Sequence, residues 1–525
     1  MTAAALLAGL LALGSTADEL ALVSAGEPRH VESRGEPWKS EDGALVGAGE
    51  GNELDSTRAL GAGDFLVRAV LSIDEPDGTA ASLVLGWNNH FGFDGRGRTY
   101  YVNGPWFGGR VQTLGNATGE VVAGEELVLE VERTGGRVTF RAGGREVHAL
   151  DAAGPVGPVG LSPWRATLRV RELSVRGAVT DLPELPELVD VFTSGEGYPS
   201  FRIPALAVAR DGALLAFAEG RERASDHAEN DLVLRRSADS GRTWGELQVV
   251  AEDGANCLNN PCPVVDRESG RILLAYQRFP EGIHEREVVP GYDGDAVCRS
   301  LLVHSDDGGR TWSTPRDVTR QVKRPARVTS IASGPGAGVQ LREGPHAGRL
   351  VLPFNEGPFG AWRVYAAWSD DGGESWSYGE PAPAGSPGHG NEVQVAELPG
   401  GRLLLNSRSH GGAKCRKVAV SEDGGATWSP LVDEPKLPEP QCQASLLRAG
   451  ERLLFLNPAS RTGRFGGRLR RSDDWGATWT DGLLLYPGSF AYSCLAELEG
   501  GRVACLFERD GYARISLALV EPGAL

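Results

Sequence analysis

Eight short segments between residues 201 and 508 carry side chains that could do chemistry together. They combine arginines, which grip an anion through paired hydrogen bonds, with carboxyl groups, which can move a proton, and with a tyrosine hydroxyl. Each residue alone is weak support, because the chain has 48 arginines and a lone glutamate is more often a solvated surface residue. The functional interpretation depends on the presence of all these segments in one chain and on their order. The segments are Phe201-Arg-Ile-Pro204, Leu215-Ala-Phe-Ala-Glu-Gly-Arg221, Ser225-Asp-His-Ala-Glu229, Asn391-Glu-Val-Gln-Val-Ala-Glu-Leu398, Leu405-Asn-Ser-Arg408, Arg464-Phe-Gly-Gly467, Phe490-Ala-Tyr-Ser493 and Leu506-Phe-Glu508.

A repeated octapeptide, Ser-x-Asp-x-Gly-x-[Thr/Ser]-Trp, is interspersed among these segments. Successive copies are 68, 64, 52 and 51 residues apart, so the chain from residue 186 onward holds about six units of roughly 59 residues. Such a period predicts one four-stranded sheet per unit, arranged as a six-bladed β-propeller. The Asp can accept backbone hydrogen bonds, the Gly supplies a positive φ and the Trp can pack into the sheet, which predicts a structural turn. The five copies begin at Ser237, Ser305, Ser369, Ser421 and Ser472.

The N-terminal third has a different pattern. Short apolar–polar alternations bounded by Gly-Gly turns predict an antiparallel β-sandwich, whereas residues 20–60 are rich in Gly, Glu and Ala and are expected to be irregular. Near the other end, residues 513–520 could pair with residues 188–192 and so close the propeller without an open edge. The alternating segments are 66–73, 127–131, 137–141 and 166–175.

These patterns predict an all-β chain of several parts. An apolar run ending in small residues resembles a signal peptide, although no Lys or Arg precedes Arg29, and it leads us to expect an exported protein, secreted or periplasmic, with a cytoplasmic one as the alternative. The expected parts are a signal peptide (1–17), a β-sandwich accessory domain (18–180), a linker (181–189) and a six-bladed propeller (190–525).

Composition excludes several classes of function. The net charge of −17 argues against nucleic acid or an anionic membrane as the main partner, and membrane insertion is not expected. The sequence holds no Cys/His spacing typical of a zinc site and no phosphate-binding loop, so neither a metal nor an organic cofactor is expected. The seven cysteines could include one loop closed by Cys257 and Cys262, or all be free thiols.

The octapeptides resemble the Asp-boxes of sialidases, which also occur in other propellers. Phe201-Arg-Ile-Pro204 resembles the motif that opens sialidase catalytic domains, and the other segments follow in that family's order. The match covers roughly residues 190–525. The chain therefore resembles the bacterial-type exo-sialidases, or neuraminidases, with Asp-box (BNR) repeats.

The resemblance implies that three arginines grip the carboxylate of the substrate. Arg202 would be the first and Arg408 the second. Arg464 would be the third, with Arg461 and Arg468 as close rivals in the same stretch.

The resemblance also implies the remaining roles. Asp226 would be the acid/base, Tyr492 the nucleophile and Glu392 the base that takes the tyrosine proton. Glu508 would hold the first arginine in position, and Arg221 is expected among the substrate-binding residues.

The chemistry of a sialoside explains this combination. Its anomeric carbon bears a carboxylate, which guanidinium groups can clamp and which would repel a carboxylate nucleophile. A neutral phenol avoids that repulsion, and sialidases are the tyrosine-nucleophile exception among glycosidases. Two displacements at one carbon imply retention. We therefore expect a retaining exo-α-sialidase acting on sialylated glycoproteins, glycolipids or oligosaccharides. The alternatives are a trans-sialidase, a sialidase for a different nonulosonic acid, or a non-catalytic glycan- or protein-binding propeller.

The N-terminal domain resembles concanavalin-like or laminin-G-like lectin folds, most clearly in Gly157-Pro-Val-Gly-Leu161. Several aromatic side chains there could stack on sugar rings, although packing in the core or between domains is the main interpretation. They are Trp87, Tyr100, Tyr101, Trp106 and Trp164.

Overall fold

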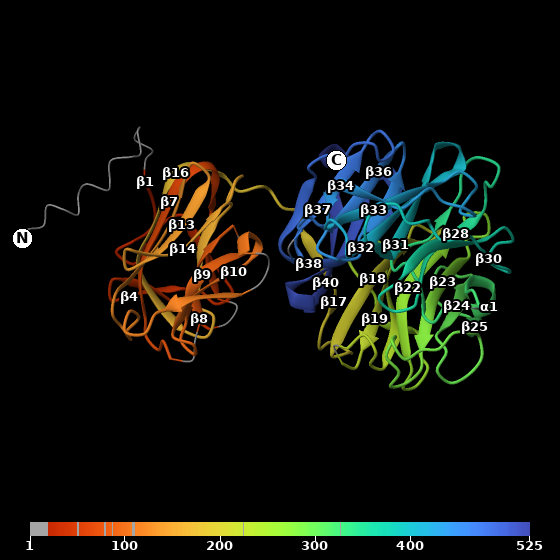
Figure 1. Cartoon of the computed structure of the whole chain (residues 1–525), viewed down its shortest axis with the longest axis horizontal. Coiled ribbons are helices and arrows are strands. Elements are labelled where there is room, and N and C mark those ends of the chain that lie inside the picture. Colours follow the sequence, from red (N-terminus) through yellow and green to blue (C-terminus); the bar gives the residue numbers. More distant parts are fainter. Residues whose placement is uncertain are drawn as a thin grey trace, which may run out of the picture. The chain divides into compact units, whose positions relative to one another are not determined.

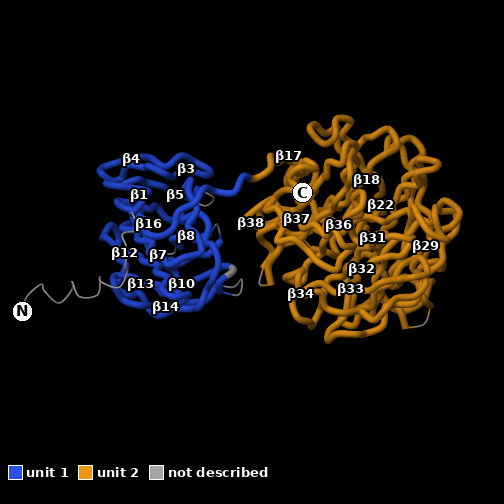
Figure 2. Tube along the Cα trace, turned by 90° about the horizontal axis from the view of Figure 1, so that it is seen from above, with its two compact units in different colours: residues 1–184 blue, residues 185–525 orange. Residues whose placement is uncertain are grey.

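The computed structural model describes residues 19–525 except 50–51, 78–79, 87, 108–110, 224, 326 and 462. The chain divides into two compact units, residues 1–184 and 185–525 (Figure 2). The expected signal peptide lies outside the described residues, as does Trp87. No helix in the described part of the chain is long and apolar enough to cross a membrane.

The N-terminal unit consists of two antiparallel sheets whose apolar side chains form one common cluster. Strand β7 pairs with β12 and β16 at the centre of the first sheet, in the order β14-β13-β12-β7-β16-β1-β2, with β5 beside β16 and β4 beside β5. The second sheet has the order β11-β10-β9-β8-β15-β6-β3. The first comprises β1 (Glu19–Ser24), β2 (Glu27–Pro28), β4 (Lys39–Glu41), β5 (Ala44–Ala48), β7 (Arg58–Ile73), β12 (Leu127–Thr134), β13 (Arg137–Ala142), β14 (Arg145–Asp151) and β16 (Thr167–Asp181); the second comprises β3 (Val31–Arg34), β6 (Glu53–Ser56), β8 (Ala80–Leu85), β9 (Asn89–Asp94), β10 (Thr99–Asn103), β11 (Gln112–Asn116) and β15 (Val159–Ser162).

The expectation that residues 20–60 are irregular is wrong, because their described part contains strands β1 to β6 and the start of β7. Each of the strands β1 to β6 is too short to show a period-2 pattern, and only isolated side chains such as Leu22, Leu45 and Leu54 reach the core. Their strand structure comes from pairing with the longer β16 and with β15, which a local pattern does not reveal.

The aromatic residues singled out in this unit have different surroundings. Tyr100 lies fully in the core and Trp106 packs against it, as the packing interpretation expects. Tyr101 lies on the other face of the sheet, and Trp164 is 44% exposed.

The described part of the C-terminal unit (Figure 1) contains four hydrogen-bonded sheets, which divide into six sets of antiparallel strands, because β20 and β22 join two of the sets through a single parallel pair, Asn230 with Cys257. β38 belongs to two sets, since its first half pairs with β37 and its second half with β39. The sets contain β17 (Leu188–Thr193), β40 (Arg514–Val520), β39 (Val503–Arg509) and β38 (Leu483–Glu497); β18 (Ser200–Val208), β19 (Leu214–Arg221), β20 (Asn230–Ser237) and β21 (Gln248–Ala251); β22 (Cys257–Val265), β23 (Ile272–Phe279), β24 (Arg299–Ser305) and β25 (Arg316–Asp317); β26 (Ile331–Ser333), β27 (Val339–Gln340), β28 (Leu350–Glu356), β29 (Arg363–Ser369) and β30 (Ser377–Tyr378); β31 (His389–Leu398), β32 (Arg402–His410), β33 (Cys415–Ser421) and β34 (Val432–Pro438); and β35 (Ser445–Ala449), β36 (Arg452–Pro458), β37 (Phe465–Ser472) and β38. A single-turn helix, α1 (Thr319–Val322), follows β25.

Neighbouring sets pack on one another in cyclic order. Apolar side chains of β19 and β23 share one cluster, those of β23 and β28 the next, and those of β28 and β31 the one after. Further clusters join β31 to β35, β36 to β39, and finally β39 to β18. The expected pairing of the two ends is confirmed, because β17 and β40 are antiparallel with Leu188 opposite Ala518.

The octapeptides form the expected turns. In the second copy the hydroxyl of Ser305 donates to Asp307 at 2.8 Å and accepts from the backbone N–H of Gly309 at 2.8 Å. The backbone and hydroxyl of Thr311 donate to the same carboxylate at 2.9 and 2.6 Å. The other four copies repeat these bonds, so each copy ties a strand end to the following loop.

These turns predict how stability depends on pH. Hydrogen bonds from Thr243 lower the pKa of Asp239 to about 2, and equivalent bonds lower the pKa of Asp307 and Asp474. A carboxyl group whose pKa is lower in the folded than in the unfolded chain stabilises the fold above its unfolded pKa and loses that contribution as the pH falls toward the folded value. We therefore expect the urea concentration that half unfolds the C-terminal unit to decrease as the pH is lowered from about 4 to about 2. Circular dichroism measures this unfolding. An equally steep fall in Asp239→Asn, Asp307→Asn and Asp474→Asn combined would contradict this origin.

Candidate active site

Half of the residues expected to do chemistry line one cavity of the C-terminal unit, whereas Arg202, Arg408, Arg464 and Glu508 are not among its lining residues. The cavity occupies about 150 Å³, and Arg221, Asp226, Glu392 and Tyr492 are among its lining residues. The other lining residues are Ile203, His227, Asn259, Asn260, Phe279, Glu285, Ser330, Ile331, Ala332, Asn355, Trp362 and Asn391.

Irregularities in four strands, β18, β22, β31 and β38, aim side chains at this cavity. The pairing register shifts between Arg202 and Ala205 in β18 and between Asn259 and Cys262 in β22. It also shifts where β31 carries Glu392 and where β38 carries Tyr492. Such bulges turn side chains out of the regular alternation and are common beside active sites. In β18 the bulge includes Ile203 with φ of 61°, a conformation that is strained for a β-branched residue.

Tyr492, Glu392 and Arg408 form a compact hydrogen-bonded group. The hydroxyl of Tyr492 donates to Oε1 of Glu392, and Nη1 of Arg408 donates to Oε2 of Glu392 at 2.8 Å and to the Tyr492 hydroxyl at 3.1 Å. Tyr492 is 5% exposed. One carboxylate oxygen is thus placed to receive the phenolic proton, and the guanidinium lies where it can stabilise the phenolate that remains.

The electrostatics of the group set its protonation state before reaction, with the base ionised and the phenol still holding its proton. Burial, and then the charge of Glu392, raise the pKa of Tyr492 well above its usual value. Burial also tends to raise the pKa of Glu392, but the guanidinium of Arg408 outweighs it and the net pKa is lowered. The ground state is therefore a neutral phenol hydrogen-bonded to an ionised carboxylate.

A buried carboxylate fixes Arg202. Nε of Arg202 donates to Glu508 at 2.7 Å, and the same carboxylate accepts the backbone N–H groups of Ile203 at 2.8 Å and Tyr492 at 3.1 Å. Glu508 is fully buried. The guanidinium of Arg202 lies 5.3 Å from the ring of Tyr492 and 4.0 Å from that of Tyr512. Glu508 thereby links the backbones of β18 and β38 at the site.

The structure separates the three candidates for the third arginine. Arg464 donates to the hydroxyl of Tyr512 at 3.0 Å, and its guanidinium lies 5.3 Å from the Tyr492 ring. Arg461 instead donates to backbone carbonyls of residues 413, 414 and 435, and Arg468 to that of Gly482. Among these three arginines, only Arg464 therefore has described contacts near Tyr492.

Asp226 also lines the cavity and is held by Arg221. Nη1 of Arg221 donates to Asp226 at 2.8 Å, while Nε of Arg221 donates to the fully buried Glu219 at 2.8 Å. The Asp226 side chain is 71% exposed and Arg221 is 1% exposed. Burial of part of the carboxyl raises the pKa of Asp226, but Arg221 and then Arg202 outweigh this and the net pKa is lowered. Arg221 thus lines the cavity with its guanidinium already bonded to Glu219 and Asp226, and it orients Asp226.

Several residues at the site escaped the sequence interpretation. Tyr512, which contacts two arginines, lies in the loop before β40 and belongs to no matched segment. Glu219 stands inside a matched segment, so its spacing of two from Arg221 was an available signal for a buried pair. No pattern pointed to Trp362 or to Glu285, which accepts the indole N–H of Trp362 at 2.7 Å.

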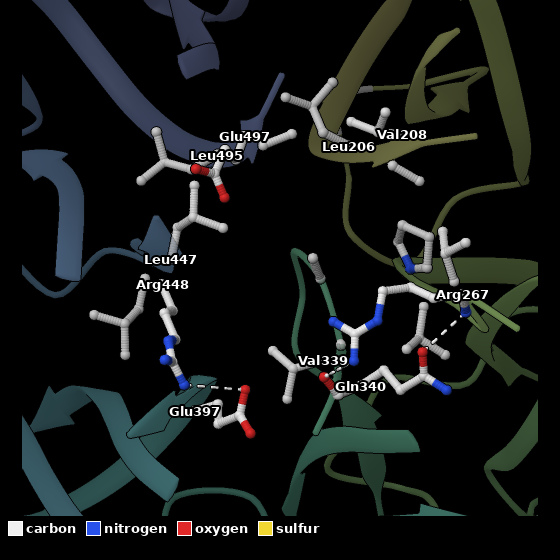
Figure 3. A pocket seen from close by; sticks show the side chains of 18 of the residues that line it. Leu206, Val208, Arg267, Val339, Gln340, Glu397, Leu447, Arg448, Leu495 and Glu497 are labelled. Atoms are coloured by element: carbon white, nitrogen blue, oxygen red, sulfur yellow. Dashed lines mark hydrogen bonds and ion pairs between the residues drawn. The ribbon is translucent and has the colours of Figure 1, made fainter. Parts of the chain in front are cut away.

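The cavity in Figure 3 lies elsewhere in the same unit. It occupies about 240 Å³ near the C-terminal ends of β18, β22, β31 and β38, where Leu206, Glu397, Leu447 and Arg448 line it. Arg448 is paired with Glu397 at 3.3 Å, and none of the expected site residues lines this cavity. Nor does the described part of the chain hold a group of three His, Cys, Asp or Glu side chains that could bind a metal ion. Its cysteines, Cys257 and Cys262 included, are free and buried.

Comparison with known proteins supplies an independent view. Residues 212–505 match the family model of the BNR repeat-like domain. The chain is 36% identical over 388 residues to a sialidase of Micromonospora viridifaciens, covering 68% of this chain and 59% of that protein. It is 32% identical to an exo-alpha-sialidase of Aspergillus fumigatus, covering 61% of this chain and 81% of that protein, and 32% identical to mouse sialidase-3, covering 61% and 90%. The chain spans only about 60% of the length of the Micromonospora protein and of a Bacteroides fragilis sialidase.

Solved structures share the fold. The Hadza microbial sialidase Hz136 superposes with a TM-score of 0.61 at 24% identity, covering 90% of this chain and 96% of that chain. A leech intramolecular trans-sialidase, solved with 2,7-anhydro-Neu5Ac, gives a TM-score of 0.58 at 18% identity, covering 90% and 98%. Because each match covers 90% of this chain, it includes residues of both units.

Proposed function

The chain belongs to the family of sialidases with BNR repeats, and from this we propose that it is a retaining exo-α-sialidase that releases terminal sialic acids from glycoconjugates through a tyrosyl intermediate. The observation that carries the proposal is the Tyr492–Glu392–Arg408 group beside two further guanidiniums. A binding module needs an anion site but has no use for a phenol hydrogen-bonded to an ionised carboxylate.

We propose the six-bladed propeller and the β-sandwich as the architecture. Six antiparallel sets that pack in cyclic order, with β17 and β40 paired across the ends, support the propeller. Two sheets around one apolar cluster support the sandwich. In a propeller the inner strands meet at the central axis, which accounts for residues as distant as Arg202 and Tyr492 lying together.

The first step forms the covalent bond. Arg202, Arg408 and Arg464 bind the substrate carboxylate and orient the anomeric carbon toward the Tyr492 oxygen. Glu392 takes the phenolic proton as that oxygen attacks. The bond from the anomeric carbon to the leaving oxygen breaks, and protonated Asp226 donates its proton to that oxygen.

The second step releases sialic acid. Asp226, now ionised, takes a proton from water, and the water oxygen attacks the anomeric carbon. The bond to Tyr492 breaks, and the proton held by Glu392 returns to the phenol oxygen. Both carboxyl groups regain their starting protonation, and two inversions give net retention.

The exposed position of Asp226 predicts an effect that depends on the leaving group. Asp226→Ala should lower kcat/KM for 3′-sialyllactose by about 10²–10⁴-fold, because its alcohol leaving group needs a proton. An activated aryl sialoside, which leaves as a stabilised phenolate, should lose much less. Rates for the two substrates compared with those of Glu229→Ala, another exposed carboxyl group in the same loop, check this. Equal losses on both substrates would remove Asp226 from the acid role.

The charges around Asp226 predict two different pH profiles. In the free chain Arg221 and Arg202 lower the pKa of Asp226. As the pH rises, Asp226 therefore loses the proton that the first step needs at a lower pH than an ordinary aspartic acid would. A bound substrate carboxylate offsets the charge of Arg202 and should raise the pKa of Asp226. Since kcat/KM reports the free enzyme and kcat the complex, the alkaline limb for 3′-sialyllactose should lie at higher pH in kcat than in kcat/KM. Coincident limbs would contradict the proposed electrostatics.

A further inference from the structure

The proposed acid/base, Asp226, lies in a loop that leaves most of its carboxyl group in water. The loop joins β19 to β20, and the Asp226 side chain is 71% exposed. An exposed carboxyl group on a loop samples several rotamers unless other groups restrain it, whereas proton transfer in catalysis needs a fixed geometry toward the leaving oxygen. The position of Asp226 therefore has to come from its neighbours.

Strand β22 begins directly beside this loop. Asn230, the first residue of β20 after the loop, pairs in parallel with Cys257, the first residue of β22. Alternation along the strand places Cys257 and Asn259 on one side and Leu258 on the other, where Leu258 packs into a different apolar cluster from Cys257. Two polar side chains of β22 thus face the loop that carries Asp226.

Both side chains contact the main-chain carbonyl group of Asp226. Nδ2 of Asn259 donates to this carbonyl oxygen at 3.2 Å, and Sγ of Cys257 lies 3.1 Å from it. Sγ of Cys257 also lies 2.7 Å from Oδ1 of Asn259 and accepts from Nδ2 of the fully buried Asn230 at 3.0 Å. The thiol has one proton, so it can donate to one of the two oxygens at a time. In either arrangement the carbonyl keeps at least one donor, which fixes the peptide plane that follows Asp226.

Burial keeps the thiol of Cys257 protonated. Cys257 is 1% exposed, and burial, followed by the charge of Glu219, raises the pKa of the Cys257 thiol well above its usual value. A protonated thiol is a weak hydrogen-bond donor, whereas a thiolate would repel the carbonyl oxygen of Asp226. At neutral pH the Cys257 thiol is therefore a donor toward the oxygens that face it.

The same segment also reaches the carboxyl group of Asp226, through two intermediate side chains. The backbone N–H of Asn260 donates to Glu219 at 2.7 Å. Glu219 in turn holds Arg221, which donates to Asp226. Asn260 has φ of 56° in the bulge of β22, a left-handed conformation that asparagine tolerates better than most residues. Residues 257–260 thus restrain Asp226 at both ends, its carbonyl directly and its carboxylate through Arg221.

We propose that Cys257 and Asn259 are positioning residues for the acid/base, which hold the main chain of Asp226 so that its proton meets the leaving oxygen. The inference rests on the proposed catalysis, in which Asp226 protonates the leaving group. Asn259 also lines the cavity, so a role in binding the sugar has to be separated from this one. A lost contact with sialic acid would affect every sialoside equally, whereas a displaced acid affects substrates with poor leaving groups most.

The test is a selectivity ratio, kcat/KM for an activated aryl sialoside divided by kcat/KM for 3′-sialyllactose. Asn259→Leu keeps the side-chain volume and removes the amide, and it should raise this ratio by about tenfold or more, because misplacing a catalytic group by about 1 Å costs about 10²-fold. Cys257→Ala should raise the ratio by about threefold, since a thiol is the weaker donor. Cys257→Ser restores a donor and should bring the ratio back toward that of the wild type.

A matched control and a double variant complete the experiment. Cys505→Ala removes an equally buried thiol, whose sulfur lies 4.0 Å from the carbonyl oxygen of Val503 on its own strand, and it should leave the ratio unchanged. In an Asp226→Ala chain, adding Asn259→Leu should also leave the ratio unchanged, because no acid remains to be misplaced. Thermal midpoints of all variants show whether each chain is folded at the assay temperature.

Three results would overturn the inference. They are an unchanged ratio in Asn259→Leu, a ratio in Cys257→Ala no higher than in Cys505→Ala, and a further rise when Asn259→Leu is added to Asp226→Ala. The failure of the proposed catalysis would look different. If Asp226→Ala itself left the ratio unchanged, Asp226 would lose the acid role, and the positioning role would fall with it.

Discussion

Tyr492→Phe should reduce kcat for an aryl sialoside by about 10³-fold or more, because a nucleophile removed from a group that acts as a unit costs most of its rate enhancement. Phenylalanine fills the same volume, so the buried position should keep its packing. Only the hydroxyl that donates to Glu392 and accepts from Arg408 is lost. Initial rates and the thermal midpoint, measured together, separate loss of chemistry from loss of fold.

A matched control is available in Tyr276→Phe. Tyr276 is fully buried, and its hydroxyl has no hydrogen-bond partner among the described residues, so its removal should leave kcat unchanged. Full activity in Tyr492→Phe would exclude the tyrosine as nucleophile. A loss confined to KM would assign it to substrate binding alone.

Glu508→Ala should destabilise the C-terminal unit by about 3–5 kcal/mol, the usual result of removing one partner of a buried ion pair. Arg202 would remain buried without its carboxylate, and the backbone N–H groups of Ile203 and Tyr492 would lose their acceptor. Urea denaturation followed by tryptophan fluorescence measures the change. Substrate binding should also weaken, because Arg202 loses the contact that fixes it.

Two further variants sharpen this prediction. Glu508→Gln retains a side-chain oxygen for the backbone donors and should recover part of the stability but not the charge opposite Arg202. Glu374→Ala removes an exposed partner of Arg271 and should cost no more than about 1 kcal/mol. A Glu508→Ala chain as stable as Glu374→Ala would mean that the buried pair does not hold the site together.

Features built from local chemistry could be predicted from the sequence. The Asp-box turn depends on a carboxylate, a small hydroxyl residue and a glycine within eight positions, so its hydrogen bonds follow from spacing alone, as Asp307 shows. One distant pairing was predicted too, that of β17 with β40, the first and last strands of the C-terminal unit, because leaving both unpaired would expose two sheet edges.

Features that depend on distant pairing could not be predicted in the same way. The strands between residues 20 and 60 exist because longer strands accept their hydrogen bonds. Likewise, no local pattern brings Glu392 to Tyr492, one hundred residues away. Their association was expected only through family order, and the bulges that aim them have no signature in composition.

The order of motifs in the family predicted which residues lie at the site, but it did not predict the side chains that surround them. Arg221 was expected simply to bind substrate, whereas it lies buried between Glu219 and Asp226. Tyr512 was not expected at all, yet its ring and hydroxyl contact Arg202 and Arg464. Both roles arise from side-chain packing around the cavity, which sequence order does not describe.

Peptide mass spectrometry after incubation with 2,3-difluorosialic acid would test the proposed chemistry most directly. Fluorine at C2 is a good leaving group, and fluorine at C3 slows breakdown of the intermediate by destabilising the positive charge that develops at the anomeric carbon. We predict a single covalent sugar adduct on the peptide that contains Tyr492, lost in Tyr492→Phe and retained in Tyr276→Phe. An adduct on a carboxyl group such as Glu392, or turnover of the reagent by the wild-type chain with inversion at the anomeric carbon, would contradict a tyrosyl intermediate.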